Sequence, residues 1–263
     1  MNEPMLVEGF EFAPHAVTVD SSLQQEKHRC CDIPTDLYGS RADLTHFTSE
    51  TIMASKRAGV SINGSVHVQQ VMDMREPIFV GETLLMSGIV TSIEPAPKGD
   101  LIRSSFEFRR ADGSIPLIAD RISLRLDPKR TDTTSDRTKP SHIDSATQAR
   151  LNVGDKQLIP ADVAAFSEDA ENLIHSDPDV ARAFGFRAPI AGGVMAIAFM
   201  MEVLQRLGPP HQVRIAVSFR RPMFWDDRLA IMTDRNDTKL SRIVILNADD
   251  KVVNRAVVEN FVV

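Results

Sequence analysis

The sequence has little cysteine, no long apolar run and no concentrated positive charge. Its two cysteines, Cys30 and Cys31, are adjacent, so a disulfide between them would be strained and a disulfide scaffold is excluded. No run of about 18 apolar residues could cross a membrane, and the N-terminus MNEPMLVEGFEF lacks the basic and apolar regions of a signal peptide. We therefore expect a cytoplasmic protein with no membrane partner.

The charge and composition narrow the classes of protein further. The net charge is −6, and lysine and arginine are spread along the chain, which argues against a nucleic-acid partner. No pair of histidines has the spacing of metal ligands, so we expect no metal. The chain has 263 residues, 43% of them hydrophobic, which is enough for two domains of roughly 100 to 150 residues each.

One short pattern occurs twice. Residues 75–84 read REPIFVGETL and residues 220–229 read RRPMFWDDRL, at a separation of 220 − 75 = 145 residues. Each copy lies between two stretches that alternate like β-strands, so proline and the acidic residues predict a strand, a turn and a second strand. We interpret the pattern as turn chemistry, which identifies the architecture and carries no catalysis.

The segments around each copy also match. Apolar residues at helical spacing predict helices over 45–59 and 192–208, each ending on a glycine, and four or so antiparallel strands follow each helix. A long helix wrapped by such a sheet is the hotdog arrangement, so we predict an α+β protein with two tandem hotdog domains. The N-terminal domain spans 1–127, a polar linker spans 128–150, and the C-terminal domain spans 151–263.

One stretch of the C-terminal domain carries a more specific pattern. Residues 172–190 read NLIHSDPDVARAFGFRAPI, and AGGVMAIAFMMEVLQRL follows. This stretch resembles the signature of the MaoC-like family of (R)-specific enoyl-CoA hydratases and acyl dehydratases. The matching positions are Asn172, Ile174, His175, Asp177, Pro178, Ala181, Gly185, Phe186, Pro189, Ile190 and Gly193. The resemblance implies a double-hotdog form in which one half works and the other is degenerate.

Two positions depart from the family pattern. The position of the family's catalytic aspartate is Ala170 here, flanked by Asp169 and Glu171, and a one-residue bulge would bring Asp169 into the site. The family's His-Gly pair is Gly192-Gly193, which removes a side chain and leaves the backbone donor that the resemblance assigns to the oxyanion hole. The first departure affects the acid/base pair and the second affects the substrate contact.

The residues themselves suit the addition of water to a 2-enoyl thioester. His175 titrates near neutral pH and can move the proton, while Asn172, or a carboxylate at Asp169 or Glu171, could hold the water. The backbone at Gly193 begins a helix, whose positive end would stabilise charge on the thioester oxygen. Gly192 would let the substrate approach the backbone closely. Asp177 and Pro178 predict only the start of a short helix.

The apolar helix that follows could take part in substrate binding. Met195 and Phe199 could line a channel for the acyl chain, although a place in the core is the alternative for such residues. The N-terminal half lacks the signature, since the 145-residue separation puts Cys30 opposite His175 and Lys27 opposite Asn172. His28 and His46 are its loose candidates for a functional histidine.

The sequence thus predicts a hydro-lyase of fatty acid metabolism. It would hydrate and dehydrate reversibly between 2-enoyl and 3-hydroxyacyl thioesters, with an acyl-CoA as its substrate and no cofactor, and a homodimer fits these expectations. The alternatives are a non-catalytic acyl-thioester binding protein, which the missing aspartate and histidine favour, and a hotdog thioesterase.

Overall fold

The structure is a computed structural model, and it describes residues 6–62, 65–127, 130, 151–168, 171–234 and 240–263. The N-terminal half contains β1 (Glu11–Thr18), α1 (Ser21–Cys30), α2 (Leu44–Arg57), β2 (Ser65–Met74), β3 (Thr83–Ala96), β4 (Gly99–Arg109) and β5 (Leu117–Leu126). The C-terminal half contains β6 (Leu151–Gln157), α3 (Pro160–Phe166), the short 3-10 helix η3 (Leu173–His175), α4 (Pro178–Ala183), α5 (Gly193–Leu207), β7 (Gln212–Phe219), β8 (Arg228–Thr233), β9 (Arg242–Asn247) and β10 (Val252–Val262).

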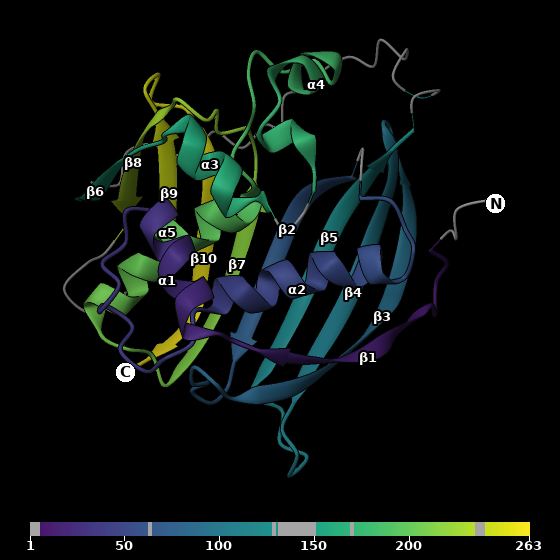
Figure 1. Ribbon diagram of the computed structural model, residues 1–263, viewed down its shortest axis with the longest axis vertical. Coiled ribbons are helices and arrows are strands. Elements are labelled where there is room, and N and C mark those ends of the chain that lie inside the picture. Colours follow the sequence, from purple (N-terminus) through teal and green to yellow (C-terminus); the bar gives the residue numbers. More distant parts are fainter. Residues whose placement is uncertain (1–5, 63–64, 128–129, 131–150, 169–170, 235–239) are drawn as a thin grey trace.

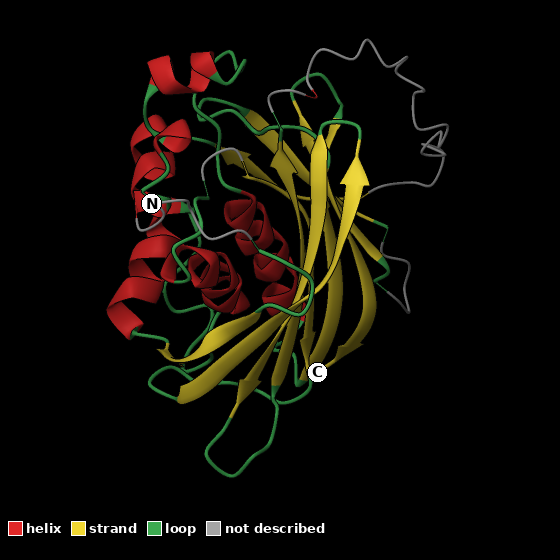
Figure 2. Cartoon of the chain, turned by 90° about the vertical axis from the view of Figure 1, so that its right-hand side faces the viewer, coloured by secondary structure: helices red, strands yellow, loops and turns green. Residues whose placement is uncertain are grey.

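The strands form one antiparallel sheet that curves around the two long helices (Figures 1 and 2). Their order is β1-β3-β4-β5-β2-β7-β10-β9-β8-β6, so the second five strands repeat the first five in reverse order. The two halves meet where β2 pairs with β7, with Gln70 opposite Val217. The α+β fold with two tandem hotdog units, each a long helix wrapped by antiparallel strands, is therefore confirmed.

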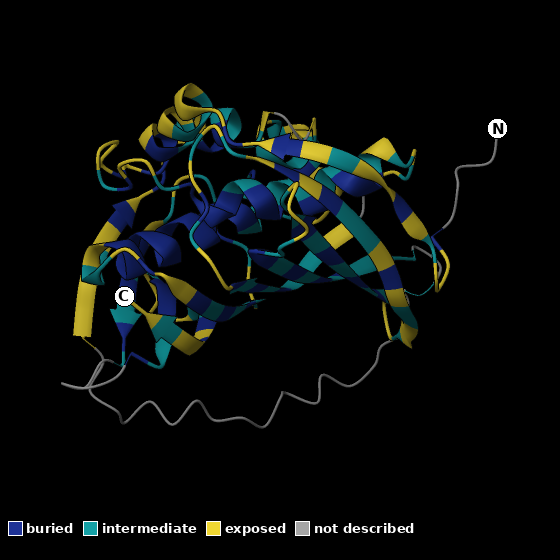
Figure 3. Ribbon diagram, turned by 90° about the horizontal axis from the view of Figure 1, so that it is seen from below, coloured by how far each residue is buried: buried dark blue, intermediate teal, exposed yellow. Residues whose placement is uncertain are grey.

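The two long helices differ in what surrounds them. Every residue of α5 from Val194 to Gln205 is buried, because the sheet and other helices enclose it (Figure 3). This explains why the run is apolar apart from Glu202 and Gln205. Helix α2 contacts α5 and buries a more polar face. Among the described residues, no helix is long and apolar enough to span a membrane.

The repeated pattern forms the same turn in both halves. The Phe79 amide donates to the Glu82 carboxylate at 3.0 Å, and the Phe224 amide donates to the Asp227 carboxylate at 2.8 Å. Ahead of each long helix, a residue forms an isolated β-bridge with this turn: Arg41 with Phe79, and Ile190 with Phe224. The repeat therefore serves architecture, as its turn chemistry predicted.

The bridges also correct the alignment of the two halves. The residues that enter the helices, Arg41 and Ile190, are 190 − 41 = 149 apart, so the 145-residue separation does not hold there. The sequence analysis also did not foresee β1, β6, α1 or α3. The predicted linker over 128–150 lies outside the described residues apart from Arg130, and the domain boundaries remain predictions.

Candidate functional site

A cleft opens in the C-terminal half between α3, the segment that follows it and η3. Its volume is about 610 Å³. The residues around it are Ala164, Ala165, Ser167, Glu168, Glu171, Asn172, Leu173, His175 and Ser176. The cleft thus brings together two of the residues that the sequence singled out, Asn172 and His175.

The orientation of His175 is fixed by one hydrogen bond. Its Nδ1 lies 2.7 Å from the carbonyl oxygen of Ile190, and because a carbonyl can only accept, Nδ1 carries the proton. The other ring nitrogen, Nε2, is then the one with a free electron pair. Burial lowers the pKa of His175, and the bond to Ile190 opposes that shift more weakly. His175 is therefore a neutral base at pH 7.

Helix α5 begins beside this imidazole without a side-chain cap. Gly192 is the N-cap residue and Gly193 the first helical residue, so the first amides of the helix lack a side-chain acceptor there. A Cβ atom placed on Gly192 would lie 3.7 Å from Cε1 of His175 and 3.6 Å from Oγ of Ser167. The open helix end, the imidazole and the Ser167 hydroxyl therefore border one space.

Gly193 has a packing reason of its own. A Cβ atom there would lie 2.9 Å from Cε1 of Phe219, so the aromatic ring on β7 requires a glycine at this position. Both glycines thus serve different needs: Gly193 admits the Phe219 ring, and Gly192 leaves the helix end open.

Asn172 has a local structural role. Its Oδ1 accepts from the Ile174 amide at 3.4 Å, which caps η3. Its Nδ2 makes no hydrogen bond to a described residue, so this donor is available to the cleft. Contact of Asn172 with a water molecule stays a prediction.

Glu171 connects the cleft to the N-terminal half. It adopts the left-handed backbone conformation, with φ of 51°, which is uncommon for a residue with a side chain. Its carboxylate lies 2.9 Å from Nζ of Lys56, near the end of α2. An exposed ion pair therefore joins one wall of the cleft to the helix of the other half.

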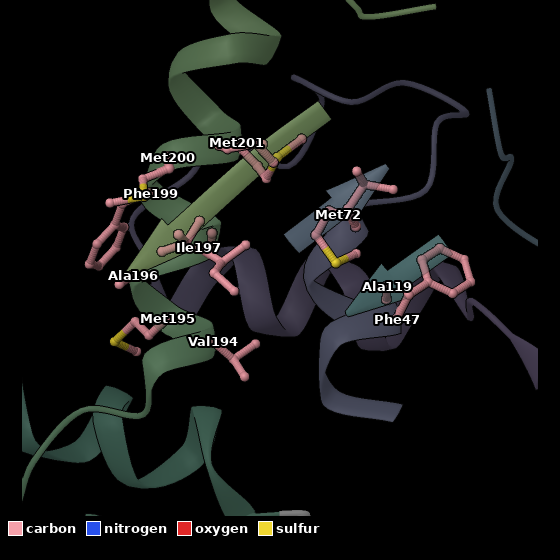
Figure 4. Packing of buried hydrophobic residues seen from close by; sticks show 14 of the residues in the cluster. Phe47, Met72, Ala119, Val194, Met195, Ala196, Ile197, Phe199, Met200 and Met201 are labelled. Carbon is pink, nitrogen blue, oxygen red and sulfur yellow. The ribbon is translucent and has the colours of Figure 1, made fainter. Parts of the chain in front are cut away.

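The remaining predicted residues lie in different places. Asp169 and Ala170 fall outside the described residues, so the predicted bulge is untested. Asp177 caps α4 through the amides of Asp179 and Val180, as predicted. Met195 and Phe199 are buried in the core and do not border the cleft (Figure 4). Their contact with an acyl chain stays a prediction.

Ser167 was missed by the sequence analysis. It follows α3 in the run AAFS, and that run carries no motif and no spacing that would single out a serine. Its place in the site depends on how α3 packs beside α5, which the local sequence does not reveal.

Within the described part of the chain, no group of three His, Cys, Asp or Glu residues could hold a metal ion.

In the N-terminal half, an aspartate side chain caps the start of α2, which corresponds to the start of α5. Asp43 is the equivalent of Gly192 in the N-terminal half. Each of the two residues comes two positions after the bridge residue and just before the long helix. The Asp43 carboxylate accepts from the Thr45 amide at 2.9 Å and pairs with Nε2 of His28 at 2.9 Å. Both side chains are buried. The N-terminal end of α2 is therefore closed, and the equivalent end of α5 is open.

One protein-family model matches the C-terminal half of the chain. Residues 132–256 match the MaoC like domain. The match covers the cleft, His175 and the start of α5, and it supports the resemblance drawn from the signature. No protein with a curated description matches the sequence.

Solved structures share the fold of the whole chain at low sequence identity. HtdX from Mycobacterium tuberculosis has 17% identity and a TM-score of 0.76, covering 93% of this chain and 97% of that chain. A MaoC-like dehydratase from Phytophthora capsici has 16% identity and a TM-score of 0.69, covering 99% and 98%. An acyl-ACP thioesterase from Bacteroides thetaiotaomicron has 11% identity and a TM-score of 0.59, covering 94% and 96%. Solved structures that share this fold thus include both a dehydratase and a thioesterase.

Proposed function

We propose that the protein is an acyl-thioester hydratase or dehydratase whose working site lies in the C-terminal half. It converts 2-enoyl and 3-hydroxyacyl thioesters into one another, with coenzyme A as the expected carrier, and needs no cofactor. The observation that carries the proposal is the position of the neutral His175 imidazole beside the uncapped start of α5. The dehydratase neighbours and the MaoC like domain match support the same class of reaction.

The geometry supports a simple division of labour. Nε2 of His175 takes a proton from water while the water oxygen forms a bond to C3 of the enoyl group. The electron pair of the C2=C3 bond moves toward the thioester carbonyl, and its oxygen becomes negative. The amide of Gly193 and the positive end of α5 stabilise that oxygen. His175 then returns the proton to C2, so atoms and charge balance.

The second partner for the water is a separate proposal. Nδ2 of Asn172 has no other described partner and borders the same cleft, which makes it a donor for the water oxygen. Asp169 is the alternative partner if the loop brings its carboxylate inward. Either group orients the water, while His175 moves the proton.

The closed N-terminal helix end supports the choice of half. At the position of Gly192, Asp43 already places a carboxylate on the first turn of α2, where a thioester oxygen would otherwise bind. Like charges repel, so an enolate oxygen cannot be stabilised at that end. The N-terminal half is then left to complete the sheet and hold the acyl group.

One assay tests the proposal. The absorbance of the enoyl group of crotonyl-CoA is followed with the protein present, and free thiol is measured in parallel. Loss of the enoyl signal without thiol release is the expected result. Thiol release would show a thioesterase, and binding of crotonyl-CoA with neither change would show a binding protein.

A further inference from the structure

The interior of the N-terminal unit contains a buried guanidinium that no described carboxylate neutralises; the ring of Phe106, 5.6 Å from its Cζ, offers it only a cation–π contact. Arg121 on β5 is 5% exposed and faces α2. Its Nη1 donates to the carbonyl oxygen of Thr51 at 2.5 Å and its Nη2 to the hydroxyl of Ser55 at 2.8 Å, both uncharged acceptors. Its Nε is buried with no hydrogen-bond partner, and no described carboxylate pairs with it. Such a buried cation is costly unless something compensates its charge.

Further polar atoms without partners lie in the same part of the sheet. Gln70 on β2 and Ser104 on β4 are the direct cross-strand neighbours of Arg121, on either side of it. Oε1 of Gln70 and Oγ of Ser104 are buried and make no hydrogen bond. Figure 1 shows α2 lying across these three strands. A row of unsatisfied polar groups therefore runs beneath α2.

The hotdog fold does not require this polarity. Across the 145-residue separation of the strands, Gln70 corresponds to Ile215, which pairs with Val258 just as Gln70 pairs with Arg121. Ile215 and Val258 are both buried in the core. The same structural position is thus apolar in one half and charged in the other, so the charge calls for a reason beyond folding.

Two sets of contacts lie between the polar row and the candidate site. Along α2, Ser55 is followed by Lys56, whose ammonium pairs with Glu171 on the cleft wall. Through the sheet, the ring of His67 on β2 lies 4.5 Å from the ring of Phe219, which in turn contacts Gly193.

His67 continues the row toward the cleft. It pairs across the strands with Ser123, and a bulge before Gln69 keeps both His67 and Gln70 on the inner face. Neither ring nitrogen of His67 makes a hydrogen bond to a described residue. Burial, and after it the charge of Arg121, lowers the pKa of His67 to about 3, so His67 adds no second charge.

We propose that Arg121 recognises a carboxylate at the far end of the substrate's acyl group, with Gln70 and Ser104 beside it. This rests on the proposed function, because the thioester end of the same molecule must lie at His175. A carboxylate supplies the negative charge that the interior lacks and accepts hydrogen bonds from a guanidinium in a fixed geometry. The preferred substrates are therefore 2-enoyl thioesters that carry a second, free carboxyl group.

The test compares substrates of equal chain length that differ only at the far end. Wild-type kcat/KM is measured for 2-enoyl-CoA esters of six to ten carbons ending in methyl or in carboxylate. At the best length, the carboxylate series is expected to be at least about tenfold better, as for removal of a charged hydrogen bond. Equal or better use of the methyl series at every length would overturn the inference.

A binding measurement separates this inference from the proposed reaction. Saturated octanedioyl-CoA and octanoyl-CoA cannot be hydrated, and their affinities are measured by equilibrium dialysis. Tighter binding of octanedioyl-CoA supports recognition by Arg121 even if no enoyl-CoA is hydrated. Hydration of enoyl-CoA without any preference, in turnover or in binding, refutes the recognition and leaves the proposed function intact.

Two variants assign the preference to Arg121. Arg121→Met should abolish the preference for carboxylate-ended substrates. Arg103→Met should retain that preference, because Arg103 lies on the outer face of β4 and pairs with Glu94. Melting temperatures show whether each variant folds. If Arg121→Met does not fold, Ser55→Ala removes the acceptor that orients Nη2 and should reduce the preference at least about threefold. An unchanged preference in whichever of the two variants folds contradicts the assignment.

Discussion

Replacing Gly192 with aspartate should stabilise the protein and inactivate it at the same time. In the N-terminal half, Asp43 occupies this position and its carboxylate accepts from the amide two residues later. A carboxylate at Gly192 would likewise accept from the Val194 amide. The backbone φ of Gly192 is −63°, and its Cβ atom would make only ordinary contacts, the nearest at 3.6 Å, so the side chain fits.

The size of both effects follows from the helix end. An aspartate cap in place of glycine contributes a few tenths of a kcal/mol, and a negative charge at the positive helix end adds about 0.3–1 kcal/mol. For a chain of this size, roughly 1 kcal/mol corresponds to about 2–4 °C in Tm. The carboxylate also places a negative charge at the helix end beside the Gly193 amide, where the thioester oxygen would bind, and loss of such an oxyanion site costs about 10²–10³ in kcat.

The assay measures Tm by calorimetry and crotonyl-CoA hydration on the same preparation. Gly192→Ala is the matched control, because it adds the Cβ atom without an acceptor or a charge and leaves both the Gly193 and the Val194 amide free. We expect Gly192→Ala to retain at least about a tenth of wild-type turnover, as for a small steric change. Wild-type turnover in Gly192→Asp would refute the assignment of the oxyanion site to this helix end.

The other predictions concern titratable groups. Burial lowers the pKa of His175, so its neutral form persists below pH 6.5. In a pH profile, kcat/KM should therefore fall only toward acid, with a midpoint below pH 6.5. A fall centred above pH 6.5 would contradict this. His46→Ala and folded His28→Ala should each keep most activity. His28→Ala breaks the buried bond to Asp43, so denaturant unfolding should show a free energy of unfolding lower by about 1–3 kcal/mol. If the loop bulges, Asp169→Asn should lower turnover by about 10² or more. If Asp169→Asn is silent and Ala170→Asp also yields no hydration of any enoyl-CoA, the protein is a binding protein.

The regular elements could be predicted from the sequence because their signals are local. The strand over 65–74 alternates along its length, and the helix that starts at Gly193 is apolar and ends at a glycine, so both were located closely. The repeated turn was also predictable, because each copy of the pattern contains the proline and the acidic residue that form the turn. In contrast, β1 and β6 are the two edge strands and consist mostly of exposed residues, and such strands give a weak pattern.

The candidate site was predictable only in part. His175 and Asn172 lie within a continuous signature, so their shared cleft was expected. Ser167 comes from another element, and only the packing of α3 brings it near Gly192. The relation between Asp43 and Gly192 was hidden because the two halves differ in spacing: 145 residues between the turns and 149 at the helix starts.

The most direct measurement compares His175→Ala with the wild type in the hydration of crotonyl-CoA at saturating substrate. If His175 moves the proton, turnover should fall by at least about a hundredfold, while Tm stays within a few degrees of the wild type because the imidazole makes only one described hydrogen bond. A folded His175→Ala variant with near wild-type turnover would contradict the account and move the reaction away from this cleft.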